Sequence, residues 1–486
     1  MTSELTTQRI PVRAFLLFLS LWICCLPPHI RADSFDTFGL GSRNKGLGGT
    51  GVALSGAGSA VYYNPAALAG LTDTELGLEY SQSFLDLTLE RNGPNKWWID
   101  YINFEPDGSY QDMIEATRPS LEAARNIPDM RGLNLVLAGP LLWRITFGLA
   151  AHIPGRTLVK QKFGPSETPY FLDYSVPSRR FSFLLGLAAE IAPYLSVGLG
   201  TSILASTEGE AVAHVPLDDA NREVLFYTDY DFRTKAAPTA GLLFSAGEKL
   251  DLGFSYRGEL SMGIDTQQLM ITNVDVGPFR LDMPLPVRLR ATTQFSPRRV
   301  SLGVAWRPSE RIVLTGEVTQ VAWSAYSPPF PDIEIDYSEI DKIALPLKHP
   351  VVPEVPDVGF KDIVVPRVGV EAGIGHGVTF RAGSFYHPSP APAQRGPTNI
   401  IAPDLLGLTF GIGADLNPGW IFPRPLEINF HLQGIDLIGG TIEKDESLFK
   451  DESSNSDGVQ NSNPGFPGIE YDGWIFSFGV GIVLPL

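Results

Sequence analysis

Residues 404–416 read DLLGLTFGIGADL, and the alternation within this stretch decides the fold. Its apolar face consists of Leu406, Leu408, Phe410, Ile412, Ala414 and Leu416. The small or polar face between them consists of Gly407, Thr409, Gly411, Gly413 and Asp415. Successive side chains of a β-strand point to opposite faces, so a period of two predicts a strand that separates two unlike environments.

The same period recurs along the whole chain. Fourteen segments carry it, at 75–90, 132–138, 142–153, 180–191, 194–206, 222–245, 249–262, 287–306, 311–323, 364–374, 377–386, 404–416, 425–437 and 472–486. Pro297 interrupts the eighth segment and indicates a bulge or a split strand there. An even number of strands suits a single-chain bacterial barrel. We therefore expect an all-β fold, a 14-stranded antiparallel transmembrane β-barrel.

Strand length and turn pattern favour a barrel in a membrane. Most of the segments have about 10 residues or more, as a tilted membrane strand needs. Short turns, such as Gly139-Pro140 and His376-Gly377, alternate with long connections. Short periplasmic turns and long outer loops are typical of outer-membrane barrels. A soluble β-rich fold, which would turn the apolar faces inward, is the alternative.

The composition excludes several classes of protein. The chain has 486 residues, of which 19% are charged and 44% are hydrophobic. This apolar content is too high for a disordered chain. The 49 glycines and 40 prolines argue against a helix-rich fold. The net charge of −17 argues against nucleic acid as a partner, because phosphate binding needs a basic surface.

The first 32 residues are interpreted as a signal peptide. Arg9 and Arg13 precede an apolar run at 14–26, which is too short to span a membrane as a helix. Cys24 and Cys25 both lie in this segment. The exported chain would therefore contain no cysteine, which excludes a disulfide scaffold, a thiolate metal site and a cysteine nucleophile.

A glycine-rich segment without strand alternation follows. Residues 38–71 read FGLGSRNKGLGGTGVALSGAGSAVYYNPAALAGL. Because it precedes the first strand, we expect it to fill the barrel lumen as a plug, the hatch. Its glycines match a dinucleotide-binding fingerprint in letters only, since no strand precedes them. We predict a signal peptide at 1–32, a hatch at 33–73 and a barrel at 74–486, with long extracellular loops at 91–131, 153–179, 263–284, 324–363, 387–403 and 441–471.

The chain resembles the FadL/TodX family of outer-membrane transporters for long-chain fatty acids and other hydrophobic compounds. The motifs that carry this resemblance are Gly46-Leu47-Gly48-Gly49, AVYYNPAAL at 60–68, VAWS at 321–324, GFKD at 359–362, RVGVE at 367–371, FRAGSFY at 380–386 and SPAP at 389–392. Their order and spacing agree with the family over the exported chain. The chain departs from the family at the terminal Leu486 and at the acidic loop 441–471.

The resemblance implies a passive channel for fatty acids or other hydrophobic molecules, gated by the hatch. The residues it assigns to gating are Gly46, Gly48, Gly49, Asn64, Pro65 and Ala66. A simple turn between two packed segments is the other interpretation of the Asn64-Pro65-Ala66 triplet.

The strand pattern also places charges on the polar faces. These charges are Arg144, Arg180, Glu190, Arg257, Arg288, Arg290, Glu317, Arg367, Glu371, Arg381 and Glu427. Most should pair with one another or with the hatch. One arginine could instead bind a ligand carboxylate. The candidate ligand-binding residues are Arg257, Arg381 and the loop aromatics Trp97, Trp98 and Phe330, and an interfacial aromatic girdle is the alternative for the aromatics.

The expected partners follow from this reading. They are a hydrophobic small molecule (a fatty acid or a hydrocarbon), outer-membrane lipid with lipopolysaccharide, and the barrel insertion machinery. The aromatic alternation from Trp474 to Leu486 resembles the signal that this machinery recognises. We expect a monomer in the Gram-negative outer membrane, without cofactor, metal or enzymatic activity. A barrel of the same fold that acts in assembly or surface attachment is the alternative function.

Overall fold

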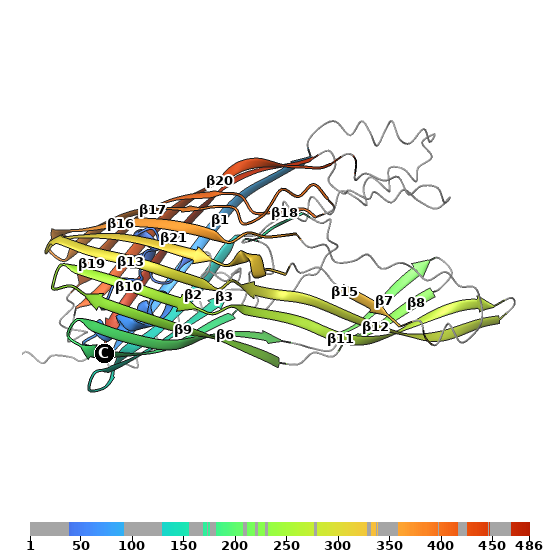
Figure 1. The fold of residues 1–486 in the computed structure, drawn as a ribbon, viewed down its shortest axis with the longest axis horizontal. Helices are drawn as coiled ribbons and strands as arrows, with labels where there is room; N and C mark the ends of the chain where they lie inside the picture. The colour runs from blue at the N-terminus through green and yellow to red at the C-terminus, as the bar shows by residue number, and fades with distance from the viewer. Residues whose placement is uncertain are drawn as a thin grey trace, which may run out of the picture.

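The structure is a computed structural model. It describes residues 38–91, 129–154, 169–172, 174, 181–207, 211–218, 222–228, 232–276, 279–327, 332–336, 338, 358–396, 398–416, 425–445, 447 and 468–486. The signal-peptide prediction and most of the long loops lie outside these ranges. Within them the dominant feature is one closed β-barrel with further, smaller sheets (Figure 1).

The barrel contains fourteen antiparallel strands, as the alternation predicts. In barrel order they are β1 (Glu75–Arg91), β2 (Met130–Leu142), β3 (Ile145–Pro154), β5 (Phe181–Ala192), β6 (Leu195–Thr207), β9 (Phe232–Ser245), β10 (Leu250–Arg257), β13 (Arg299–Ser309), β14 (Ile312–Val321), β16 (Ile363–Gly375), β17 (Val378–His387), β19 (Leu405–Leu416), β20 (Leu426–Glu443) and β21 (Gly468–Pro485). The first and last strands pair along their full length, from Glu75 with Pro485 to Arg91 with Ile469. The predicted fold class is therefore confirmed.

The apolar faces of the strands turn outward. In β19, Leu408 and Phe410 are 55% and 59% exposed, whereas Thr409 between them is fully buried. Other barrel strands repeat this with Leu302 on β13, Val368 on β16 and Phe430 on β20, which are all exposed. An apolar outer band with small and polar residues inside is the arrangement of an outer-membrane barrel, and the soluble alternative would require the reverse.

Tight turns join the strands at one end of the barrel. His376-Gly377 connects β16 with β17 as predicted, with φ angles of 55° and 74°. The turn expected at Gly139-Pro140 lies instead at Trp143-Arg144, because β2 continues through a register shift after Pro140. The C-terminus lies at this end (Figure 1). Short turns mark the periplasmic end of such barrels.

One predicted loop proves to be a long β-hairpin. The stretch 263–284 lies within β11 (Leu260–Val276) and β12 (Phe279–Ser296), which project far beyond the barrel (Figure 1). Pro297 separates β12 from the barrel strand β13, so the predicted strand 287–306 is split. The alternation missed this hairpin because the hairpin lies beyond the barrel, where lipid imposes no period of two. Arg288 and Arg290, expected in the lumen, pair within this projection with Asp265 and Asp332.

Smaller elements complete the long-loop end. β15 (Asp332–Ile335) adds a third strand to the projecting hairpin, and β7 (Ala211–Asp218) pairs with β8 (Arg222–Thr228). β8 occupies the first part of the predicted strand 222–245, whose second part alone is β9 of the barrel. The short strands β4 (Tyr170–Phe171) and β18 (Ile400–Ile401) pair in parallel. A single 3₁₀ turn, η3 (Trp323–Ala325), follows β14.

The hatch lies inside the barrel and is built from short helical pieces. They are α3 (Ser42–Gly46), α4 (Ala60–Tyr63) and the 3₁₀ helix η1 (Pro65–Gly70), drawn in blue within the strands in Figure 1. Among the described residues no helix is both long enough and apolar enough to cross a membrane. The three hatch pieces are only 5, 4 and 6 residues long, so the hatch is held by its contacts with the wall rather than by long helices of its own.

The projecting hairpin should be dispensable for barrel formation. Arg257 and Arg299 are direct partners in the β10–β13 pair, so the barrel is closed below the hairpin. We expect a variant with a short turn in place of residues 259–297 to fold, as judged by heat-modifiable mobility on SDS gels. A matched deletion of β13 should abolish folding, because it opens the sheet. Failure of the hairpin deletion to fold would show that the projection nucleates the barrel.

Candidate functional site

Glycines in the barrel wall let the hatch approach the strands at backbone distance. A Cβ atom at Gly383 would collide with the backbone nitrogen of Gly48, and one at Gly253 with the carbonyl oxygen of Val52. On the hatch side, Gly48 has a φ of 71°, which L side chains rarely adopt. Its N–H donates to Oγ1 of Thr409 on β19 at 2.8 Å. Part of the glycine excess is therefore a packing requirement of the plug.

Neighbouring glycines of the Gly46-Leu47-Gly48-Gly49 motif complete this contact. A Cβ atom at Gly46 would lie 3.0 Å from Cα of Gly411, so α3 packs directly on β19. Gly49 has a φ of 78°. The motif therefore shapes a tight turn against the wall, and its role in gating stays a prediction.

Asn64 ties the hatch to the wall. Its side chain is fully buried, and Nδ2 donates to the carbonyl of Val52 at 2.7 Å and to that of Leu242 on β9 at 3.0 Å. Its Oδ1 accepts from the N–H of Ala66 at 3.0 Å and so caps η1, which begins at Pro65. The Asn64-Pro65-Ala66 triplet is thus a turn fixed at both ends, which is compatible with both sequence interpretations.

A buried ion pair anchors α3. The ammonium of Lys45 lies 2.9 Å from Oε1 of Glu79 on β1, and neither side chain is more than 6% exposed. Glu79 also accepts from the N–H of Gly41 and from Nδ2 of Asn134, each at 2.9 Å. A buried charge is tolerated only when it is paired and hydrogen-bonded in this way.

A second network joins the hatch to the opposite strands. Arg43 makes a bidentate contact with Glu371 on β16, with both distances 2.8 Å. Arg381 on β17 lies 2.6 Å from the same carboxylate and 3.6 Å from Glu427. The alternation of the strands therefore placed Glu371, Arg381 and Glu427 correctly on the lumen face.

Two further wall residues, Arg257 and Glu317, form a third attachment of the hatch. Arg257 donates to the carbonyl of Tyr62 and lies 4.0 Å above its ring. Glu317 accepts from the N–H groups of Gly51 and Val52 at 3.0 and 3.1 Å. Hatch and wall are thus joined by charged contacts around the lumen, and at this level the barrel is a filled, polar layer.

Above that layer the lumen becomes apolar. On β1 the inward side chains change from Glu79, Ser81 and Ser83 to Leu87 and Leu89, all of them buried. The same change occurs on β20 and β21. We call the resulting cluster the apolar compartment, and it consists of Phe38, Leu87, Leu89, Met130, Phe171, Tyr174, Ile401, Leu405, Ile435, Leu437, Ile442, Ile469 and Ile475. Phe38 is the contribution of the hatch, so the compartment lies between the hatch and the outer loops.

The outward side chains show the opposite change at the same height. Beyond Phe84, which is 41% exposed, Asp86, Thr88 and Glu90 face outward on β1. Asp436 and Glu470 do the same on β20 and β21. The strands therefore rise above the lipid here, with an apolar interior and a charged exterior.

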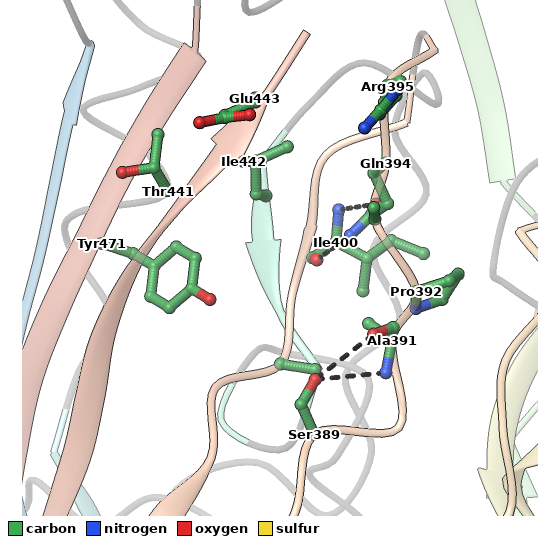
Figure 2. A pocket seen from close by; sticks show the side chains of 12 residues that line it. Ser389, Ala391, Pro392, Gln394, Arg395, Ile400, Thr441, Ile442, Glu443 and Tyr471 are labelled. Atoms are coloured by element: carbon green, nitrogen blue, oxygen red, sulfur yellow. Dashed lines mark hydrogen bonds between the residues drawn. The ribbon is translucent and has the colours of Figure 1, made fainter.

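A pocket of about 280 Å³ opens at the outer end of the apolar compartment. Figure 2 shows Tyr471 and Ile442 on one side and Ala391, Gln394 and Arg395 on the other. The remaining lining residues are Ser389, Pro392, Ala393, Ile400, Ala402, Thr441 and Glu443. Ile442 belongs to the apolar compartment, and Tyr471 packs against it. The pocket, called the mouth below, therefore adjoins the compartment.

Lys444 holds one wall of this mouth in place. Its ammonium donates to the carbonyls of Gly396 and Thr398 at 2.6 and 2.7 Å. Burial lowers the pKa of Lys444 from 10.5 to about 8. Between these two values the unfolded chain binds more protons than the folded chain, so the stability contributed here rises with pH through that window.

The sequence-predicted ligand residues do not gather at this mouth. Arg257 lies against Tyr62 and Arg381 within the ion-pair network, so both contact the hatch or its partners, and their role as ligand residues stays a prediction. Trp97, Trp98 and Phe330 lie outside the described residues. The family resemblance implies an apolar pocket adjoining the hatch, but sequence reasoning did not name the residues of the apolar compartment. Their signal was present: in 83–90, SFLDLTLE, the inward positions turn apolar as the outward ones turn polar.

The part of the chain that the structure describes contains no group of three or more His, Cys, Asp or Glu side chains that could hold a metal ion. The acidic stretch at 451–458 lies outside it.

Solved structures share this architecture. No protein-family model and no curated protein matches the chain. A Pseudomonas aeruginosa FadL homologue superposes with a TM-score of 0.55 at 14% identity, covering 94% of this chain and 99% of that one. The P. putida toluene transporter TodX gives 0.51 at 14% identity over 93% and 99%, and the CymD monoaromatic hydrocarbon channel gives 0.50 at 14% over 93% and 99%. The chain therefore has the FadL/TodX fold, as its motifs predicted.

Adding one methyl group to the wall should displace the hatch. In Gly383→Ala the new Cβ would collide with the hatch backbone, and overpacking of this kind costs about 1–3 kcal/mol. We expect faster proteolysis within residues 38–73 and a lower urea midpoint. Gly434→Ala is the matched control, because no atom lies within 4 Å of its added Cβ. Equal behaviour of the two variants would contradict the close packing of hatch on wall.

Proposed function

We propose that this protein is an outer-membrane channel for the passive uptake of hydrophobic small molecules. The observation that carries the proposal is the pocket at Tyr471 and Ala391, which adjoins the apolar compartment that the barrel encloses above the hatch. A water-filled pore would need a continuous polar lumen, whereas here the polar layer is filled by the hatch. The fold shared with a toluene transporter and a monoaromatic hydrocarbon channel supports this proposal.

The compartment suits an apolar solute for a simple physical reason. Such a solute crosses the polar lipopolysaccharide layer slowly, because entry into this hydrated layer exposes its apolar surface to water. An apolar pocket at the outer loops lowers that barrier by about 25 cal/mol for each Å² of apolar surface it buries. The same surroundings offer nothing to a hydrophilic solute, so the barrel would select for hydrophobicity.

Release would then require the hatch to move. The Gly46-Leu47-Gly48-Gly49 turn and the Asn64-Pro65-Ala66 turn both bring hatch backbone against wall backbone, and we assign gating to them. Gly48 and Gly49 already have positive φ angles, so their backbone can change conformation without a Cβ clash. The charged contacts of Arg43 and Lys45 would keep the hatch anchored while these turns shift.

Surface attachment is the second candidate function, and the projecting hairpin favours it. β11, β12 and β15 form a three-stranded sheet outside the barrel with exposed ion pairs, such as Arg288 with Asp265. A barrel that only attaches to a surface would tolerate a blocked pocket, whereas a channel would not.

Filling the mouth should block uptake. In Ala391→Trp the larger side chain would occupy part of the 280 Å³ pocket, and a loss of about 1.4 kcal/mol in binding corresponds to tenfold in affinity. We expect uptake of labelled toluene and labelled oleate by cells to fall about tenfold for at least one of them. Ala236→Trp, at an exposed position on β9, is the control and should leave uptake unchanged. Uptake by Ala391→Trp at the wild-type level would contradict a route through this mouth.

Weakening the Asn64 turn should change the rate of uptake. Asn64→Ala removes two donated hydrogen bonds and one accepted one, each worth about 0.5–1.5 kcal/mol. If the hatch gates release, its open state gains population and uptake of the same labelled solutes should rise. Thr72→Ala, at an exposed hatch residue, serves as the control. Gating would be refuted by uptake that is indifferent to both Asn64→Ala and removal of the hatch.

A further inference from the structure

Two short strands lie between the pocket and the apolar compartment. β4 and β18 pair in parallel, with Tyr170 beside Ile400 and Phe171 beside Ile401. They form a sheet of their own, separate from the barrel. We call residues 170–172 and 400–402 the ribbon. Because β4 follows β3 and β18 follows β17, the ribbon joins two connections that are far apart in the sequence.

The ribbon is buried on both of its faces. Phe171 and Ile401 belong to the apolar compartment and are 0% and 1% exposed. Ile400 and Leu172 alternate with them and belong to a second apolar cluster. This second cluster, which we call the rim cluster, consists of Leu172, Val321, Trp323, Phe360, Ile363, Val365, Ile400 and Ala402. The ribbon is therefore a partition between two apolar clusters.

The pocket reaches this partition. Ile400 and Ala402 line the pocket, whereas Ile401 and Phe171 do not. Figure 2 shows the side chain of Ile400 on the pocket wall. The pocket therefore meets the ribbon on the face that belongs to the rim cluster, and the compartment begins on the other face. A molecule in the pocket would have one layer of backbone between it and the compartment.

One strand of the ribbon, β18, is fixed to the loop that carries it. Gln394 accepts from the N–H of Ile400 at 2.7 Å and donates to the carbonyl of the same residue. Lys444, which follows β20, donates to the carbonyls of Gly396 and Thr398 just before β18. These contacts tie β18 to the barrel wall through side chains.

The two strands of the ribbon are joined over a short length. The N–H of Tyr170 donates to the carbonyl of Asn399 at 3.2 Å, and that of Leu172 to the carbonyl of Ile401 at 2.9 Å. The wall strands β1 and β21, in contrast, pair along their whole length. Parts of a fold that move in function are drawn from its least stable segments. The ribbon is therefore the part of this enclosure that separates most easily.

The apolar faces of the ribbon would couple its opening to the ligand. Separation of the strands uncovers Phe171 and Ile401, and contact of this surface with water is unfavourable. A hydrophobic molecule covers the same surface and so stabilises the separated form, whereas a hydrophilic molecule does not. A ligand shifts a conformational equilibrium only through such a difference in affinity.

We propose that the ribbon is an outer gate, and that a hydrophobic molecule passes from the pocket into the compartment when β4 separates from β18. The inference rests on the proposed function, because it concerns the entry step of the same channel. β18 stays with its loop, so the opening moves β4. The barrel then has two barriers in series, with the ribbon at the outer side of the compartment and the hatch at the inner side.

A disulfide across the ribbon tests the gate. Tyr170→Cys and Ile400→Cys replace register partners, and neighbouring strands lie about 4.8 Å apart, which a disulfide can span. Cys24 and Cys25 fall in the predicted signal peptide, so the exported chain would supply no competing thiol. We expect oxidation of this double variant to lower the uptake of labelled toluene by cells about tenfold, and dithiothreitol to restore it.

The matched control joins two strands that stay paired. Gln320→Cys with Val364→Cys links register partners of β14 and β16 at exposed positions, and its oxidation should leave uptake unchanged. Equal uptake by the oxidised and reduced ribbon variant, or an equal loss in the oxidised control, would overturn the gate and leave the channel proposal intact. No uptake of toluene or oleate by wild-type cells would instead count against the proposed function itself.

Hydrogen exchange tests the gate without a substitution. In the purified wild-type protein in detergent, saturating toluene should speed the exchange of the amides at 170–172, because it favours the separated form. The amides of β21 serve as the internal control and should exchange at an unchanged rate. Ribbon amides that exchange equally fast or more slowly with toluene would overturn the gate, even if the double variant does not fold.

Discussion

The pairing of β1 with β21 is the contact on which the rest of the structure depends. In lipid an unpaired backbone N–H or C=O has no water to bind, so a membrane sheet is stable only when it has no edge. β21 meets β1 along its whole length, from Glu75 with Pro485 to Arg91 with Ile469. Closure in turn creates an interior that must be filled, and the hatch fills it.

The interior of the barrel is divided into a polar layer around the hatch and an apolar compartment above it. At the height of the hatch, polar backbone lies inside the barrel, and wall residues such as Glu79 and Glu317 satisfy its N–H groups. Above the hatch the inward side chains become apolar at Leu87 and Ile435, and the backbone of β4 and β18 pairs with itself there. The polar layer fills the barrel at the height of the hatch, and the apolar compartment above it adjoins the pocket through which we propose that a hydrophobic molecule enters. This division connects the fold with the proposed transport.

Sequence alone predicted much of the barrel and little of the site. The strands could be counted because lipid imposes a period of two, as at Leu408 and Phe410, and the motifs pointed to the family fold. The hairpin at 263–284 was missed because outside the membrane that constraint is absent. The alternation of side chains correctly placed Arg381 and Glu371 inside the barrel. It could not show that Glu371 binds both Arg43 and Arg381. The contact with Arg43 joins residues 328 positions apart, which no local pattern encodes.

The sequence by itself determined the all-β class, the number of barrel strands and the plug that precedes them, since each follows from local periodicity or composition. Only the tertiary structure decided what the plug touches, where the lumen changes from polar to apolar, and which buried groups have partners. Gly383 illustrates the difference: its place in a strand can be read from the chain, but its need to be glycine arises from Gly48 on the hatch. Gln433 illustrates the same difference, because only the carbonyl of Lys45 beside it shows which way its side-chain amide is oriented. Both depend on contacts that form when the closed sheet surrounds its own N-terminal segment.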